Sequence, residues 1–244
     1  MRADKFLVEH GFFQTRARAQ AAIEAGYVSV NGRRLTKSST KLSGSDHIEA
    51  KPVHPYVSRA ALKLVAGLDH FDIRPEGLFC LDVGSSTGGF TQVLLERGAA
   101  HVTAVDVGRD QLDPVLKTDA RVTSLEGLDA RELTMAHLPK SPELIVCDAS
   151  FIGLEKVLAR ALDLAAAEAA LVALFKPQFE VGPDFIGKGG LVKSDAPIEA
   201  TKDTAHAFLA RAGFEIVGEI HSPITGGDGN QEFLIGARAQ KSND

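Results

Sequence analysis

Short apolar runs alternate with amphipathic stretches through most of this chain. Short apolar runs predict buried strands, and we expect them at residues 78–83, 101–106, 120–124, 143–148, 169–175, 214–220 and 232–237. Apolar residues at helical spacing predict helices between the strands, at residues 59–71, 90–97, 109–116, 154–167 and 197–212. Strands that alternate with helices are typical of an α/β fold with a mostly parallel, Rossmann-like sheet.

One stretch, residues 78–95, has the pattern of a ligand-binding unit. An apolar strand ends at Asp82 and Val83, and a turn rich in glycine separates it from a helix that begins near Phe90. Strand, glycine turn and helix form the opening unit of a nucleotide-binding sheet, because glycine lets the backbone approach a ligand closely. The turn consists of Gly84, Ser85, Ser86, Thr87, Gly88 and Gly89.

The acids around this turn favour S-adenosylmethionine over a dinucleotide. The glycine spacing is G-x-x-x-G-G rather than G-x-G-x-x-G, and Asp82 stands at the strand end, where its carboxylate suits an ammonium group. S-adenosylmethionine carries such a group and no phosphate. Asp106 ends the next strand, where a carboxylate can take ribose hydroxyls, and Asp129 lies in a later loop, where it could meet the adenine amino group. The alternative is a turn that only joins strand and helix, with Asp106 as a helix cap.

The composition excludes several classes of protein. The 244 residues are 44% hydrophobic, which suits one large domain or a medium domain with a small one. No apolar run approaches the roughly 18 residues of a membrane span, and the N-terminus lacks the pattern of a secretion signal. Cys80 and Cys147 lie within apolar strands, so we expect buried thiols in a reducing, cytoplasmic compartment rather than a disulfide. The histidines show no metal-ligand spacing, and we expect no metal.

Charge is unevenly distributed along the chain. Residues 1–60 carry ten basic and five acidic side chains, whereas residues 61–244 carry 17 and 27. A basic head on an acidic body predicts a polyanion-binding module, although a basic helix face in water is the alternative. Thr15 can cap a helix that Gly26 ends, and Asn31-Gly32 predicts a β-hairpin. We therefore expect a small α+β domain over residues 1–50, a linker over 51–57 and a larger domain over 58–244.

Four charged residues are expected at one edge of the large sheet. Ligands of open α/β sheets bind beyond the carboxyl ends of the strands, where Asp148 and Lys176 end the fourth and fifth strands. Lys63 and Glu232 could join them from the preceding helix and the last strand. A lysine whose pKa is lowered can take a proton from a ribose hydroxyl, while carboxylates orient the ammonium groups. The alternative is that Lys63 extends to solvent and that the others form ordinary surface ion pairs.

The same segments resemble known families. Residues 2–32 are similar to the small RNA-binding module named after the fourth protein of the small ribosomal subunit. The larger part resembles the FtsJ-like RNA 2′-O-methyltransferases, and the whole chain resembles the TlyA family, also called hemolysin A. The segments that carry this resemblance are VSRAALKL, LDVGSSTGGFTQVLL, AVDVGRDQL, CDASFIGL, LFKPQFEVG, GGLVKS and SPITGGDGNQEFL.

The resemblance implies methylation of the 2′-hydroxyl of cytidine in ribosomal RNA, with S-adenosylmethionine as the cofactor and ribosomal RNA or subunits as partners. It implies a catalytic tetrad of Lys63, Asp148, Lys176 and Glu232. The expected cofactor contacts are Asp82, Gly84, Ser85, Ser86, Thr87, Gly88, Gly89, Phe90, Asp106, Val107, Asp129 and Asp148. The expected RNA contacts, where arginine forks can bind phosphate oxygens, are Arg2, Lys5, Arg16, Arg18, Gln20, Arg33 and Arg34.

Two other functions are compatible with the sequence. The older family name suggests a membrane-acting hemolysin, which would need an exposed amphipathic or membrane-spanning segment. A non-catalytic ribosome-binding assembly factor would keep the fold without the chemistry, and the intact tetrad argues against it. We expect a monomer that contacts no membrane.

Overall fold

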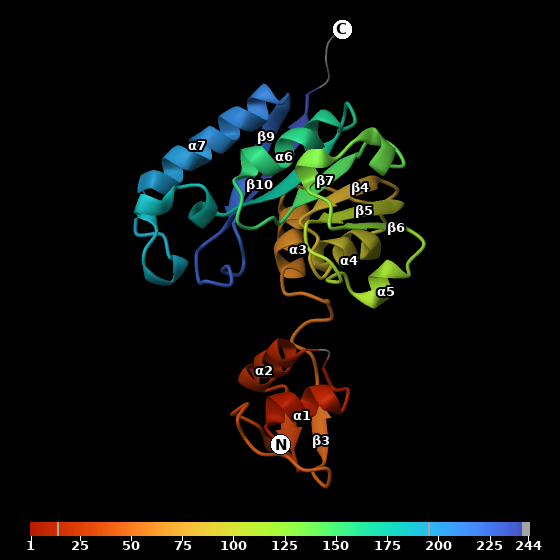
Figure 1. Cartoon of the computed structure of the whole chain (residues 1–244), viewed down its shortest axis with the longest axis vertical. Coiled ribbons are helices and arrows are strands. Elements are labelled where there is room, and N and C mark those ends of the chain that lie inside the picture. Colours follow the sequence, from red (N-terminus) through yellow and green to blue (C-terminus); the bar gives the residue numbers. More distant parts are fainter. Residues whose placement is uncertain (14, 195, 241–244) are drawn as a thin grey trace. The chain divides into compact units, whose positions relative to one another are not determined.

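Contacts within the chain fall into two sets, which divide it between Pro55 and Tyr56. The computed structural model describes residues 1–13, 15–194 and 196–240 (Figure 1). The first unit is a small α+β domain, and the second contains the large sheet. The elements of the first unit are α1 (Ala3–Glu9), α2 (Arg16–Ala25), β1 (Val28–Val30), β2 (Arg33–Arg34) and β3 (Ile48–Ala50).

The first unit forms where its local signals predict. The Thr15 side chain accepts a hydrogen bond from the backbone N–H of Arg18 and caps α2, which Gly26 ends with a φ of 81°. Asn31 and Gly32 both adopt positive φ between β1 and β2, which confirms the hairpin. Apolar side chains from both helices and from β1 pack into one core, whose buried members are Ala3, Phe6, Leu7, Phe13, Ala19, Ala22, Ile23, Val28, Leu35 and Leu42.

The second unit contains a seven-stranded sheet with the strand order β6-β5-β4-β7-β8-β10-β9. Its strands are β4 (Phe79–Val83), β5 (His101–Asp106), β6 (Val122–Glu126), β7 (Leu144–Cys147), β8 (Ala170–Phe175), β9 (Phe214–His221) and β10 (Phe233–Ala239). Strands β4 to β8 pair in parallel, whereas β10 runs antiparallel to β8 and β9. The predicted Rossmann-like α/β sheet is therefore confirmed, and the start of β10 lies at the same edge as the carboxyl ends of the parallel strands.

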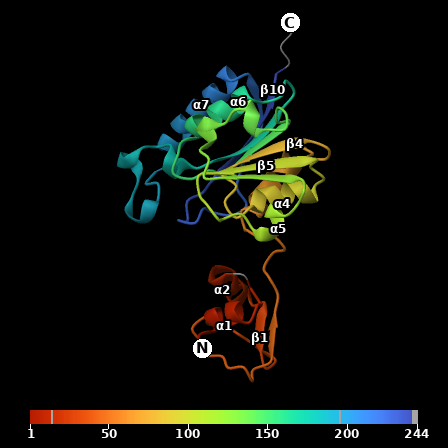
Figure 2. The ribbon, with the colours of Figure 1, turned by 45° about the vertical axis from the view of Figure 1, so that its right-hand side comes forward.

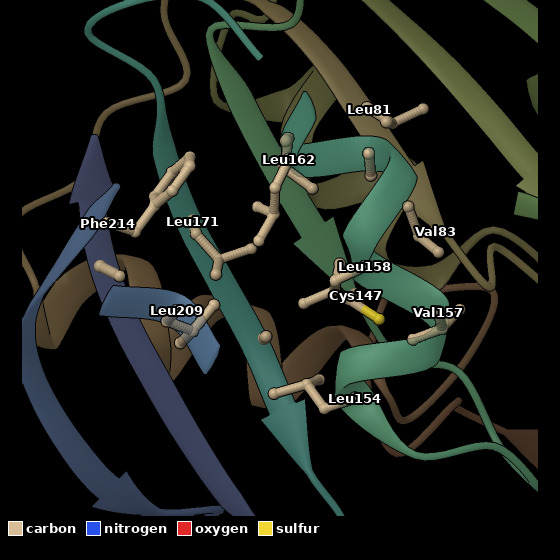
Figure 3. Packing of buried hydrophobic residues seen from close by; sticks show 14 of the residues in the cluster. Leu81, Val83, Cys147, Leu154, Val157, Leu158, Leu162, Leu171, Leu209 and Phe214 are labelled. Atoms are coloured by element: carbon tan, nitrogen blue, oxygen red, sulfur yellow. The ribbon is translucent and has the colours of Figure 1, made fainter. Parts of the chain in front are cut away.

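Helices cover both faces of this sheet (Figure 2). They are α3 (Ala61–His70), α4 (Gly89–Glu96), α5 (Pro114–Lys117), α6 (Leu154–Asp163) and α7 (Ala196–Arg211), with single 3₁₀ turns at Ala130–Glu132, Met135–His137, Pro177–Phe179, Pro183–Phe185 and Lys188–Gly190. Successive residues of a strand point to opposite faces, so Cys80 packs with α3 and α4 while Leu81 and Val83 pack with α6. Leu154, Val157, Leu158 and Leu162 of α6 lie between that helix and the strands in Figure 3. Cys80 and Cys147 are both buried free thiols.

Two local predictions differ from the structure. The helix predicted at residues 109–116 is confined to Pro114–Lys117, because the carboxylate of Glu126 accepts the backbone N–H groups of Gln111 and Leu112 and holds them outside a helix. The helix predicted at residues 59–71 is also shorter in the structure. Helix α3 begins at Ala61, and the Ser58 hydroxyl accepts the backbone N–H of Ala60 one turn earlier.

Candidate active site

The glycine turn after β4 packs tightly against the loop that follows the neighbouring strand β7. Gly84 has a φ of 80°, and a Cβ atom there would lie 2.9 Å from the Cα atom of Ala149. At Gly89, a Cβ atom would lie 2.9 Å from the Cβ atom of Ser58, which precedes α3. Both positions therefore need glycine for the packing of the protein itself, in addition to any approach to a ligand.

Asp82 lies beneath this turn, fully buried on the α4 side of the sheet. The hydroxyl of Thr91 in α4 donates to Asp82 Oδ2 at 2.6 Å, while Oδ1 has no partner among the residues that the structure describes. Burial raises the pKa of the Asp82 carboxyl to about 7, and the negative charges of Asp148 and Asp106 act in the same direction. Ser85 Oγ is a second buried polar atom with no partner within the described chain.

The larger of two adjoining cavities, about 590 Å³, lies beyond β4 and β5. Asp106 lines it at the end of β5 and accepts the backbone N–H groups of Ser86 (2.8 Å) and Gly108 (2.7 Å). Asp129 also lines the cavity, and its carboxylate pairs with Arg131 at 2.6 Å, which lowers the Asp129 pKa. The remaining predicted cofactor residues on its wall are Gly84, Ser86, Val107 and Asp148.

The smaller cavity, about 300 Å³, contains all four residues predicted as the catalytic tetrad. Glu232 Oε2 lies 2.5 Å from Lys63 Nζ, and Asp148 contacts both lysines, with Oδ1 at 2.6 Å from Lys176 Nζ and Oδ2 at 3.9 Å from Lys63 Nζ. Side-chain exposures between 3% and 13% show that the row is nearly buried. Acidic and basic groups thus alternate along one row from Glu232 to Lys176.

Five residues line both cavities, so the two spaces adjoin along a shared wall. They are Gly84, Ser86, Asp148, Ser150 and Phe151. The smaller cavity also contacts Ser85, Thr87 and Gly89 of the predicted turn, together with Phe90 of α4. Asp82 and Gly88, by contrast, line neither cavity. The structure therefore places Asp82 behind the predicted cofactor site rather than on its surface.

Three further residues of the site were not identified from the sequence. Ser150 Oγ accepts a hydrogen bond from Lys176 Nζ at 2.9 Å. Phe151 is 90% exposed at the mouth of both cavities, has a φ of 65°, and contacts the Phe179 ring at a centroid distance of 5.2 Å. Ser150 and Phe151 lie in the segment DASF at the end of the fourth strand, and Phe179 lies in the segment KPQF after the fifth strand. These positions at strand ends are the signal that could have indicated the three residues.

In the first unit, three of the predicted RNA contacts meet on one carboxylate. Arg2, Arg16 and Gln20 all contact the buried Asp4. Elsewhere Lys5 pairs with Glu9 at 3.3 Å, and the guanidinium of Arg34 donates to the backbone oxygen of Glu24. Arg33 is exposed on the hairpin and Arg18 is half-buried on α2.

The described residues contain neither a cluster of three or more side chains placed to bind a metal nor a helix long and apolar enough to cross a membrane.

Comparisons with known proteins agree with both units. Residues 56–239 match the FtsJ-like methyltransferase family, and residues 1–48 match the S4 domain. The chain is 42% identical over 242 residues, covering 98% of the chain and 90% of the relative, to the 16S/23S rRNA (cytidine-2′-O)-methyltransferase TlyA of Mycobacterium tuberculosis. It is 38% identical over 235 residues to Hemolysin A of Brachyspira hyodysenteriae, covering 96% and 98%. A solved structure named "Putative hemolysin from Streptococcus thermophilus" is similar with a TM-score of 0.79 and 37% identity, covering 99% of the chain and 89% of that structure.

Proposed function

The chain belongs to the FtsJ-like methyltransferase family and carries an S4 domain at its N-terminus, and from this premise we propose that it transfers a methyl group from S-adenosylmethionine to the 2′-hydroxyl of cytidine in ribosomal RNA. The names of the relatives support this substrate, since the relative from Mycobacterium tuberculosis is an rRNA (cytidine-2′-O)-methyltransferase. The proposed enzyme works as a monomer in the cytoplasm, on ribosomal RNA or ribosomal subunits.

The larger cavity fits S-adenosylmethionine by the chemistry of its wall. Asp106 offers carboxylate oxygens at the end of β5, where ribose hydroxyls can donate, and Asp129 offers an acceptor to the adenine amino group. Asp82 Oδ1, behind the turn, and Ser85 Oγ, on the wall of the smaller cavity, have no partner among the described residues, and such acceptor oxygens suit an ammonium group. The cofactor supplies a methyl group that its sulfonium charge has already activated, so the protein has to position the acceptor hydroxyl and manage its proton.

The alternating row of charges is the observation that carries the proposal. Lys176 Nζ is held by Asp148 Oδ1, by Ser150 Oγ and, at 3.3 Å, by the backbone oxygen of Asp148. Lys63 is held in turn by Glu232 and Asp148. In the proposed step Lys176 Nζ accepts the proton of the 2′-hydroxyl. The bound cofactor would supply the methyl group to the hydroxyl oxygen and leave as S-adenosylhomocysteine, whose sulfur keeps the electron pair of the broken bond. Asp148 orients the amine, and Lys63 with Glu232 fixes Asp148.

Substitution of Lys176 tests this step. Lys176→Ala should reduce single-turnover methyl transfer by roughly 10²–10⁴-fold, with cofactor affinity in calorimetry unchanged. Lys176→Arg should be nearly as inactive, because a guanidinium stays protonated. Lys202→Arg is the matched control, since Lys202 is also buried and ion-paired, to Glu219, but lies outside both cavities.

The product is identified by mapping ribose methylation in ribosomal RNA treated with the purified enzyme, where 2′-O-methylcytidine is expected. Methylation of a base instead of a ribose would refute the proposed function. Near wild-type single-turnover rates for Lys176→Arg would leave the reaction in place but remove Lys176 as the base, and positioning would then have to supply the rate.

A further inference from the structure

A single buried carboxylate joins the predicted RNA-contacting side chains of the first unit. Asp4 lies in α1 with no exposed surface. Its oxygens accept hydrogen bonds from Arg2 Nε at 3.1 Å, from Arg16 Nη2 at 2.6 Å and from Gln20 Nε2 at 2.8 Å. Arg2 precedes α1, whereas Arg16 and Gln20 belong to α2, so this carboxylate connects the two helices.

Although Asp4 is buried, the arginines that contact it are not. The side chains of Arg2 and Arg16 are 52% and 57% exposed. A guanidinium has five N–H donors, so each arginine keeps donors for an external acceptor while part of its fork is anchored to Asp4. Hydrogen bonds from both guanidinium groups hold the pKa of the Asp4 carboxyl well below its usual range despite burial. The anchor therefore stays negatively charged throughout the neutral pH range.

We propose that Asp4 is a positioning residue for RNA recognition, which holds the guanidinium groups of Arg2 and Arg16 as a fixed pair that binds the phosphate backbone of structured RNA. An unanchored arginine loses much of its rotamer freedom when it binds a phosphate, and this loss weakens binding. When Asp4 anchors the two arginines, their rotamer freedom is already lost on folding, so its loss no longer weakens RNA binding. The inference rests on the proposed function, because it takes the first unit to be the RNA-binding module.

The direction in which RNA affinity changes when Asp4 is neutralised distinguishes positioning by Asp4 from a simple sum of charges. Asp4 is negative and close to the expected phosphate contacts, so a sum of charges predicts tighter RNA binding when Asp4 is neutralised. Positioning predicts the opposite, because Arg2 and Arg16 lose the ionic partner that fixes them. Glu24 provides the matched comparison, since it is exposed on α2 of the same unit and carries the same charge.

The test compares Asp4→Asn with Glu24→Gln in the full chain, with binding of ribosomal RNA measured over a series of KCl concentrations. Asp4→Asn should weaken binding about five- to thirty-fold at each salt concentration, the effect expected when charge-assisted contacts lose their geometry. Glu24→Gln should bind as tightly as the wild type or slightly tighter. Amide hydrogen exchange of α1 and α2 reports whether Asp4→Asn is folded. A folded Asp4→Asn that binds RNA as tightly as the wild type overturns the proposal.

A second pair of variants decides the question if Asp4→Asn does not fold. Arg16→Lys keeps the charge but loses the fork that reaches both Asp4 and a phosphate, so binding should fall about five-fold or more. Arg33→Lys also removes a fork from a predicted RNA contact, but Arg33 forms no ion pair within the described part of the chain, so binding should fall less than in Arg16→Lys. Equal effects of the two variants overturn the proposal.

Deletion of residues 1–55 is measured alongside, to separate the inference from the function on which it rests. Unchanged RNA affinity after this deletion shows that the first unit is not the RNA-binding module, and the assignment of that unit then fails together with the inference. If the deletion lowers RNA affinity but Asp4→Asn and Arg16→Lys do not, the first unit is still the RNA-binding module. Only the anchoring role of Asp4 is then refuted.

Discussion

Replacing Asp82 with asparagine should make the stability of the large unit less dependent on pH. Burial raises the Asp82 pKa from 3.8 to about 7, so between these values the native state holds a proton that the unfolded chain has released. The free energy of unfolding therefore falls as pH rises from about 4 to about 7. At 1.36 kcal/mol per pH unit, the difference between 3.8 and 7 corresponds to about 4 kcal/mol.

Urea unfolding of the wild type and of Asp82→Asn, followed by circular dichroism at several pH values, measures this contribution. Other carboxylates titrate over the same range, so the relevant quantity is the difference in unfolding free energy between variant and wild type. That difference should shift in favour of the variant by about 3 kcal/mol between pH 5 and pH 8, because part of the change lies below pH 5. Thr91→Val should make the pH dependence steeper than in the wild type, since the Thr91 hydrogen bond favours the ionised carboxylate. A difference that stays constant with pH would contradict the reasoning.

Three further measurements probe the site and its support. Binding of S-adenosylmethionine, measured by calorimetry, should strengthen from pH 6 to pH 8 in the wild type as Asp82 ionises, and it should not do so in Asp82→Asn. Equal pH profiles of the two proteins would show that Asp82 does not interact with the ammonium group of the cofactor. Gly84→Ala should weaken cofactor binding at least about tenfold, because the added Cβ meets Ala149 and the φ of 80° is strained for alanine; unchanged affinity would show that the turn adapts. Glu180→Ala should lower the free energy of unfolding by about 1 kcal/mol, since its carboxylate accepts the backbone N–H of Leu154 at the start of α6, and an unchanged melting temperature would exclude that contribution.

The sequence predicts the parts of the fold that depend on local patterns. The predicted strand at residues 101–106 coincides with β5, since this apolar run is too short for a helix. The helix predicted at residues 109–116 was mostly wrong, because Glu126, which binds that segment, lies on the neighbouring strand β6. Such contacts between distant segments leave no periodic signal.

The candidate site, too, could be predicted only where it depends on local sequence patterns. Asp148 and Lys176 could be placed together because each follows a strand of a parallel sheet. The contact between Lys63 and Glu232 joins residues 169 positions apart and depends on the antiparallel docking of β10. Asp4 gave no sequence signal, since an aspartate in the first turn of a helix is usual at the surface, and only the fold reveals that it is buried.

The position of β10 has a consequence for the synthesis of the protein. β10 follows the other described strands in the sequence, yet it lies between β8 and β9 rather than at the edge of the sheet. While the chain is being made, β4 to β8 can pair as soon as they emerge, but the free side of β8 stays uncovered until β10 has been translated. Glu232 arrives with β10, so until then Lys63 lacks the nearer of its two carboxylate partners. A chain that ends before residue 232 would have the glycine turn and three members of the charged row without the fourth. The complete row of charges therefore forms only after β10 has been made and has paired with β8.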